Sequence, residues 1–182
     1  MNVKSLSAAI GLTILGLMAS APSIARTKAE IDASADKAIA QFYSLNPKHQ
    51  ELANKAAGIL VFGRVTKAGV GVGGEFGEGA LRVKGATVNY YSVGSGSVGL
   101  TLGAGEHREI ILFMTQDALE KFMHSEGWSA GADASFALVS KGAGGQYDTA
   151  TLNKPILGFI FGEKGLLGDL SFEGSKISKI KK

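Results

Sequence analysis

The composition of the chain changes abruptly at residues 58–79, which read GILVFGRVTKAGVGVGGEFGEG. From residue 58 to residue 174 the chain holds 24 of its 26 glycines, and many of the apolar residues there are β-branched or aromatic. Such residues favour strands, whereas glycine weakens a strand unless the backbone bends or another segment approaches it closely. We therefore expect residues 58–79 to form part of a strongly curved sheet.

Short apolar segments separated by turn residues continue beyond this stretch. Successive strands are predicted at 59–65, 69–76, 80–83, 87–93, 98–102 and 109–114. The connections between them are short, which favours antiparallel neighbours. Two closing strands are predicted at 156–161 and 166–177.

Three helices are predicted outside these strands. Thr27 and Glu30 form a capping box at the start of the first helix. An apolar stripe with helical spacing follows: Ile31, Ala35, Ala38, Phe42 and Leu45. A second helix has Asn46 as its N-cap and Pro47 in its first position, and a third begins after the N-cap Thr115. The fold class is therefore α+β: a curved glycine-rich antiparallel sheet, sandwich- or barrel-like, with two N-terminal helices and one mid-chain helix.

The first 25 residues have the layout of a secretory signal peptide. Lys4 precedes an apolar run over residues 6–19, and Ser23 and Ala25 provide the small residues that a cleavage site needs. The apolar run is shorter than the roughly 20 residues that span a bilayer. We expect cleavage after Ala25, a single domain over residues 26–182, and an exported protein in the periplasm or at the periphery of the outer membrane.

Composition and motifs argue against several classes of protein. The chain has no cysteine, which excludes disulfides, zinc sites with thiolate ligands and a cysteine nucleophile. Without Lys4 it has 18 basic and 16 acidic side chains, and so small an excess of positive charge does not favour nucleic acid binding. Gly69, Gly71 and Gly74 have the spacing of a dinucleotide-binding loop, but no helix is predicted after them. Ser129 lies in a G-x-S-x-G sequence, but no histidine follows it as a triad would need. The histidines lack the spacing of a metal pair. We expect no catalytic residue, metal or cofactor.

Charged residues between the strands are assigned to turns. His107 lies between Glu106 and Arg108 in a polar segment, and Glu75 and Glu78 are expected to be solvated. The C-terminal residues form a basic end that can meet anionic headgroups or remain a solvated tail. This end contains Lys176, Lys179, Lys181 and Lys182.

An ordered series of motifs runs along the chain. Its members are Gly58-Ile-Leu-Val-Phe62, Lys67-Ala-Gly69, Val72-Gly-Gly-Glu-Phe-Gly77 with Gly79-Ala-Leu81, Asn89-Tyr-Tyr91, Gly99-Leu100, Phe113-Met-Thr115, Gly127-Trp128, Lys164-Gly-Leu-Leu-Gly168 and Leu170-Ser-Phe-Glu-Gly174. The series resembles the SYLF domain family over nearly all of residues 26–182. It departs from the family at Gly63, where proline is frequent, and at Thr101, where bacterial members often have glutamine.

The resemblance implies lipid binding, which is known for some members, or actin binding, which is known for yeast members. For an exported, bacterial-looking chain it implies an anionic lipid or a membrane surface as partner, with phosphatidylglycerol, cardiolipin or lipopolysaccharide as candidates; actin is not an expected partner. An alternative is a protein-interaction or scaffold module of the cell envelope, whose sheet edge pairs with a strand of an envelope protein.

The candidate lipid contacts lie in the first helix and at the basic end. In this hypothesis Phe42 and Tyr43 sit at the headgroup boundary while Lys28 and Lys37 meet phosphates, and the C-terminal lysines add charge. The candidate residues are Lys28, Lys37, Phe42, Tyr43, Lys176, Lys179, Lys181 and Lys182. The same apolar stripe can instead dock the helix on the sheet, which is the commoner role of such a stripe.

Overall fold

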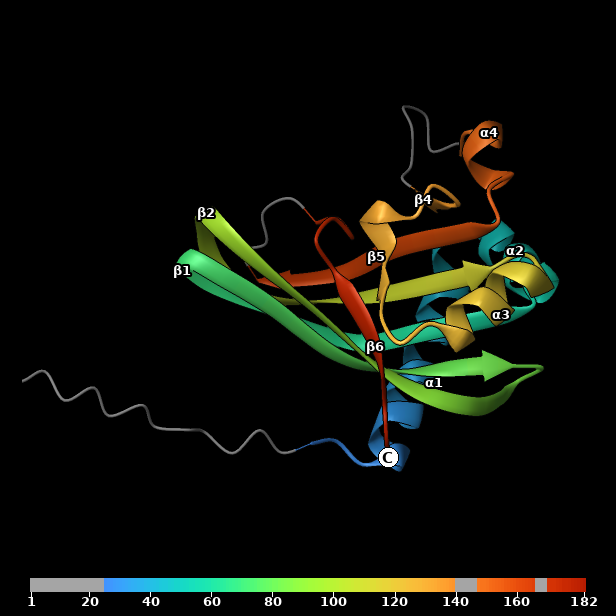
Figure 1. Cartoon of the computed structure of the whole chain (residues 1–182), viewed down its shortest axis with the longest axis horizontal. Coiled ribbons are helices and arrows are strands. Elements are labelled where there is room, and N and C mark those ends of the chain that lie inside the picture. The colour runs from blue at the N-terminus through green and yellow to red at the C-terminus, as the bar shows by residue number, and fades with distance from the viewer. Residues whose placement is uncertain (1–24, 140–146, 166–169) are drawn as a thin grey trace, which may run out of the picture.

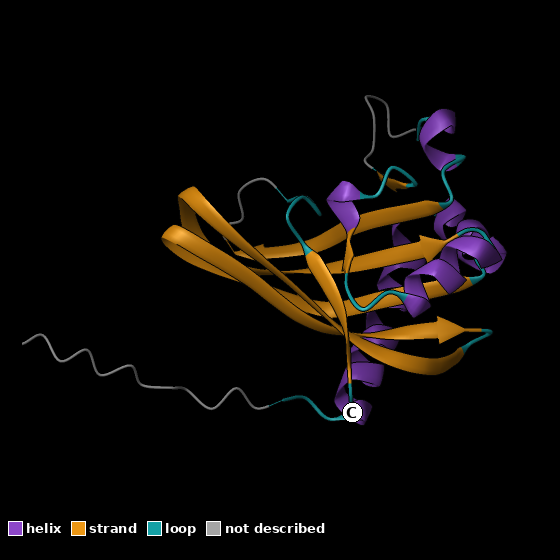
Figure 2. Ribbon diagram, in the orientation of Figure 1, coloured by secondary structure: helices purple, strands orange, loops and turns teal. Residues whose placement is uncertain are grey.

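The computed structural model of the chain describes residues 25–139, 147–165 and 170–182. Its elements are α1 (Lys28–Leu45), α2 (Pro47–Lys55), β1 (Gly58–Val83), β2 (Ala86–Phe113), α3 (Gln116–His124), β3 (Trp128–Ser129), a 3₁₀ helix (Ala130–Ala132), β4 (Phe136–Leu138), α4 (Thr149–Leu152), β5 (Ile156–Gly165) and β6 (Lys176–Ile180). Figure 1 shows α2, α3 and α4 at one end of a curled sheet, and Figure 2 shows the same arrangement by type of element. The predicted α+β class is confirmed.

Strand β2 organises the sheet, which has six strands within the described residues. Its residues 86–113 pair with β1, residues 90–94 also pair with β6, and residues 105–113 also pair with β5. These pairings are antiparallel, as predicted. The short strand β4 runs parallel to β5, so the sheet is mixed rather than wholly antiparallel.

Strands β1 and β2 turn back on themselves in their glycine-rich middles. A Cβ atom placed on Gly69 would lie 2.3 Å from the Cα of Gly73, although residues four apart in a straight strand are separated by about 13 Å. The pairing register with β2 shifts between Val70 and Val72, at this bend. Figure 1 shows both strands reversing at the same end of the molecule. The six short strands predicted between residues 59 and 114 are therefore two long bent ones, because the glycines bend the ladder without ending it.

The reversal brings the two halves of β1 into close contact. A Cβ atom on Gly79 would lie 2.5 Å from the carbonyl oxygen of Val61 and 2.6 Å from a ring carbon of Phe62. Only glycine allows this approach, because the Val61 carbonyl belongs to the backbone of a paired strand and cannot move aside. The predicted use of glycine for close backbone contact is confirmed here.

Replacing Gly79 with alanine is expected to destabilise the fold by about 1–3 kcal/mol, the usual cost of overpacking. Chemical denaturation of the two proteins measures the difference. Gly96→Ala is the matched control in β2, since a Cβ there meets nothing within 4 Å. Equal losses of stability in the two variants would contradict the proposed close contact.

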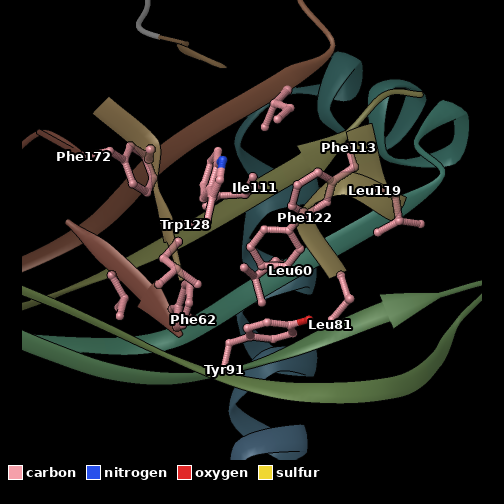
Figure 3. Packing of buried hydrophobic residues seen from close by; sticks show 14 of the residues in the cluster. Leu60, Phe62, Leu81, Tyr91, Ile111, Phe113, Leu119, Phe122, Trp128 and Phe172 are labelled. Carbon is pink, nitrogen blue, oxygen red and sulfur yellow. The ribbon is translucent and has the colours of Figure 1, made fainter. Parts of the chain in front are cut away.

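One hydrophobic core fills the inside of the curl. Side chains from both halves of the bent strands meet there with aromatic residues from α3 and the segment that follows it (Figure 3). The core includes Leu60, Phe62, Leu81, Tyr91, Ile111, Phe113, Leu119, Phe122, Trp128 and Phe172. The sheet is thus held in its curled shape by packing on its concave face.

A second core lies between α1 and the outer face of the sheet. The apolar stripe of α1 is buried there from Ile31 to Phe42, against residues of β1, β2 and β5. Asp32 ties the helix to β2, because its two carboxylate oxygens accept hydrogen bonds of 2.8 Å from the hydroxyls of Thr87 and Tyr90. The stripe therefore docks the helix on the sheet, which was one of the two roles considered for it.

The helix starts predicted from local signals are confirmed. The capping box of Thr27 and Glu30 is present, Asn46 accepts from the backbone of Lys48, and Thr115 caps α3. Other details differ from the predictions: α4 was not predicted, and the second closing strand begins at Lys176 because residues 172–174 form a bend and a turn. Its predicted start, residues 166–169, lies outside the described residues. No described helix has both the length and the apolar character needed to cross a bilayer.

Candidate functional site

A polar cleft of about 460 Å³ opens between the N-terminal half of α1 and the part of the sheet formed by β1, β2 and β5. Its positively charged side chains come from five separate segments: Arg26, Lys37, Arg64, Arg108 and Lys164. Glu30 and Glu106 are its acidic residues, so the five cations exceed the two carboxylates by three formal charges. This basic cleft is suited to an anionic ligand.

Irregularities in the strands position the basic side chains. The β1–β2 register shifts between Phe62 and Val65, next to Arg64, and the β2–β5 register shifts between Glu106 and Arg108. Such bulges redirect side chains and are frequent beside functional sites. Here they bring side chains of two strands to the same cleft.

The N-terminal turn of α1 supplies another side of the basic cleft. Arg26 precedes the helix, and its Nη2 donates a 2.9 Å hydrogen bond to the carbonyl oxygen of Glu30. Lys37 follows on the exposed side of the helix. The cleft therefore depends on the docking of α1 against the sheet.

Three buried nitrogen atoms at the basic cleft have no hydrogen-bond partner within the described residues. They are Nη1 of Arg26, Nδ1 of His107 and Nε of Arg108. Leaving a buried polar group unpaired costs about 1–3 kcal/mol, and more for a charged group. Arg26 Nη1 and Arg108 Nε are donors that an acceptor oxygen would satisfy, although neither atom is open to solvent in this conformation.

His107 links the basic cleft to the inside of the curl. Its side chain is 1 % exposed, and its Nε2 lies 2.9 Å from Oε1 of the fully buried Glu109. Burial raises the pKa of Glu109, and the nearby Glu75 carboxylate raises it further, while His107 opposes the shift. When Glu109 is protonated, its hydroxyl donates to Nε2 of His107. The other ring nitrogen of His107, Nδ1, has no partner within the described residues.

Replacing Glu109 with glutamine is expected to remove a pH dependence of stability. Because the folded-state pKa of Glu109 is raised above its ordinary value of 4.5, the stability it provides is present below that value and is lost as the pH rises through the folded-state pKa. Glutamine keeps the donor to His107 and does not ionise. Melting temperatures measured from about pH 4.5 upward should fall with rising pH more for the wild type than for the variant.

Parallel melting curves for the two proteins would contradict a raised pKa of Glu109. An exposed acid provides the control: Glu120→Gln, on the outer side of α3, is expected to leave the pH profile of the wild type unchanged.

The structure places the residues proposed from the sequence in different environments. Lys28 and Lys37 are exposed, Tyr43 is half-buried, and Phe42 is only 1 % exposed and lies in the second core. In this conformation Phe42 is not presented to a membrane surface. Of the four basic residues at the C-terminal end, Lys176, Lys179 and Lys181 are exposed.

Lys182 joins the C-terminal end to the start of α1. Its ammonium group donates to Oε1 of Glu78 at 2.6 Å and to the carbonyl oxygen of Arg26 at 2.8 Å. The backbone N–H of Arg26 donates to the other oxygen of Glu78 at 3.1 Å. The side chains of Glu78 and Lys182 are 9 % and 11 % exposed. We call these three residues the terminal clasp.

Several turn assignments made from the sequence are wrong. Glu75 and Glu78 are buried in β1 rather than solvated, and His107 lies buried in β2 rather than in a polar turn. Glu75 accepts a 3.2 Å hydrogen bond from the hydroxyl of Ser175. These polar groups sit inside strands because the bent sheet encloses them.

Most of the basic cleft was not predicted from the sequence, namely Arg26, Arg64, Arg108 and Lys164. A local signal for two of these positions does exist in the sequence. Arg64 and the Glu106-His-Arg108 segment place charged residues inside otherwise apolar strands. Among the described residues, no group of three or more histidine, aspartate or glutamate side chains is arranged to hold a metal ion.

Comparison with known proteins assigns the C-terminal half of the chain. Residues 94–182 match the Ysc84 family, described as Las17-binding protein actin regulator, which is the SYLF domain. The match confirms the resemblance to the SYLF domain family over residues 94–182, and it includes the Glu106-His-Arg108 and Lys164 positions of the basic cleft. No curated protein matches the chain.

Proposed function

From the SYLF domain match of residues 94–182, a domain of lipid-binding or actin-regulating modules, we propose that this chain binds anionic lipid at an envelope membrane. The main support for the proposal is the gathering of five basic side chains at one cleft, three of whose lining residues have a buried nitrogen without a partner within the described residues. The proposed role is binding without catalysis.

The chemistry of the basic cleft fits a phosphodiester headgroup. Guanidinium groups bind phosphate oxygens through strong charge-assisted hydrogen bonds, and Arg26 and Arg108 each have a nitrogen free for one. The ring of His107, which Glu109 holds in place, adds a polar group to the lining of the cleft. Lys37 and Lys164 at the exposed rim attract an anionic surface, at about 1 kcal/mol per basic residue.

We propose further that the protein is exported and that residues 1–25 are removed. The signal-peptide pattern supports this, and Arg26 would then be the first residue of the mature chain, in the periplasm or at the periphery of the outer membrane. Mass spectrometry of the protein recovered from the exported fraction tests the cleavage position. A first residue other than Arg26 would require another boundary.

Co-sedimentation with vesicles tests the lipid proposal. Protein from the exported fraction is mixed at low salt with phosphatidylcholine vesicles or with vesicles that contain phosphatidylglycerol, and it should pellet only with the latter. A variant that loses three rim charges, Lys37→Gln, Arg64→Gln and Lys164→Gln, should pellet much less. A matched variant, Lys48→Gln, Lys55→Gln and Lys121→Gln, has the same net charge change on exposed sites of α2 and α3 and should pellet as the wild type does.

Equal effects of the two triple variants would show that net charge, not the basic cleft, governs binding. Failure to pellet with either vesicle would reject lipid binding. If an envelope protein is then enriched from membrane-free extract, the alternative role as a protein-interaction module gains support. Actin is not a proposed partner.

A further inference from the structure

A second, apolar hollow of about 380 Å³ lies beside the basic cleft, at the C-terminal end of α1. Its walls come from α1, α2, β4 and β5, and they include Phe42, Leu45, His49, Leu138, Phe159 and Phe161. We call it the apolar cavity. Its size falls in the range of about 300–1,000 Å³ typical of small-molecule sites.

The linings of the basic cleft and the apolar cavity adjoin along β5. Phe161 lines the cavity and the next residue, Gly162, lines the cleft. A Cβ atom on Gly162 would lie 2.6 Å from Nη1 of Arg108 and 3.3 Å from the side-chain amide of Gln41. Gln41 directly precedes Phe42 of the cavity wall. A ligand that fills both hollows therefore passes over this short boundary.

The aromatic wall of the apolar cavity is already organised. The rings of Phe42 and His49 stack with centroids 4.0 Å apart, and the ring of Phe159 packs edge-on against Phe42 at 4.8 Å. His49 is fixed by hydrogen bonds to the carbonyl oxygen of Phe42 and to the hydroxyl of Tyr147. A rigid apolar wall loses little conformational entropy when a chain binds to it.

The mouth of the apolar cavity exposes large hydrophobic side chains. Leu45 is 43 % exposed and Leu138 is 37 % exposed. Exposed apolar groups gathered at one hollow indicate an interaction site more than scattered ones do. A hydrocarbon chain entering here would remove both leucines from water.

We propose that the two hollows form one site for a single anionic phospholipid, with its phosphodiester in the basic cleft and one acyl chain in the apolar cavity. The inference rests on the proposed function and makes it more specific. Binding to the charged surface of a membrane would leave the acyl chains in the bilayer, whereas this site takes one acyl chain into the protein. Charge complementarity selects the occupant: a neutral hydrocarbon would leave the three unpaired nitrogens unsatisfied.

Calorimetry with water-soluble ligands tests this site without a membrane. Dihexanoylphosphatidylglycerol below its micelle concentration is titrated into the exported protein, and glycerophosphoglycerol supplies the same headgroup without chains. Burial of about four methylene groups should make the lipid bind about 100-fold tighter than the headgroup alone. Dihexanoylphosphatidylcholine, which is zwitterionic, should bind more weakly than the anionic lipid.

A substitution at the mouth of the apolar cavity distinguishes the contributions of the two hollows to binding. Leu138→Trp places a large ring at the entrance of the apolar cavity and is expected to bring the affinity for the lipid down to that for the headgroup, with headgroup binding unchanged. Val88→Trp is the matched control, since Val88 is a 46 % exposed residue of β2 outside the cavity lining. Melting temperatures of both variants establish that they fold.

Each result bears on a different proposal. Equal affinities for lipid and headgroup in the wild type, or no effect of Leu138→Trp, would overturn the acyl-chain site and leave the proposed function standing. Pelleting with anionic vesicles but no binding of either soluble ligand would overturn the combined site, with contact limited to the membrane surface. Absence of both kinds of binding would overturn the site and the proposed function together.

Discussion

Replacing Phe42 with alanine is expected to destabilise the protein by about 3–5 kcal/mol, the range found for large aromatic residues in cores. Phe42 is 1 % exposed and its ring contacts the rings of His49 and Phe159. The substitution removes this packing and leaves a void between α1 and β5. Denaturant unfolding of the wild type and the variant measures the loss.

Leu45→Ala is the control for Phe42→Ala, because Leu45 lies one turn further along α1 and is 43 % exposed. It is expected to cost much less stability. A Phe42→Ala variant with unchanged stability but weak vesicle binding would contradict the packed position of Phe42 and would support its direct contact with the membrane.

Replacing Glu78 with glutamine is expected to cost about 3 kcal/mol, because removing one partner of a buried ion pair leaves the other uncompensated. Glu78 is the centre of the terminal clasp, where it accepts from the ammonium group of Lys182 and the backbone of Arg26. The amide keeps the size of the side chain but loses its charge. Thermal and denaturant unfolding measure the change.

Lys181→Gln serves as the control for the terminal clasp, since Lys181 is exposed and adjacent to Lys182. It should leave stability unchanged, whereas Lys182→Gln should destabilise as Glu78→Gln does. Equal stability of all three variants would mean that the clasp contributes nothing to the fold. The basic end is therefore not uniform: one of its four lysines has a structural role, and the other three remain available to a charged surface.

The first three helices could be predicted because their signals are local. The capping box of Thr27 and Glu30 lies within four residues, and the caps Asn46 and Thr115 act on the turns that directly follow them. The stripe that ends at Phe42 was compatible with two partners, and only the position of the sheet shows which face it meets. Local patterns thus define helices but not their environment.

The basic cleft could not be predicted from the sequence, because it is produced by register. Arg64 and Arg108 come together only through the antiparallel pairing of β1 with β2, and the bulges that aim them have no sequence signature of their own. Glu75 and Glu78 look like turn residues among glycines, yet the reversal of β1 buries both. The glycines predicted curvature, but the depth of the bend depends on contacts such as that of Gly79 with Val61.

The terminal clasp also affects the order in which the chain can fold. The contact between Arg26 and Lys182 joins residues 156 apart in the sequence, and β6 completes the sheet against residues 90–94 of β2. Topologies dominated by such distant contacts fold slowly, over milliseconds to seconds. Strand β6 can pair with β2 only after residues 176–182 have been synthesised. A chain shortened before residue 176 is expected to leave the edge of β2 without its partner, and such open edges are starting points for aggregation.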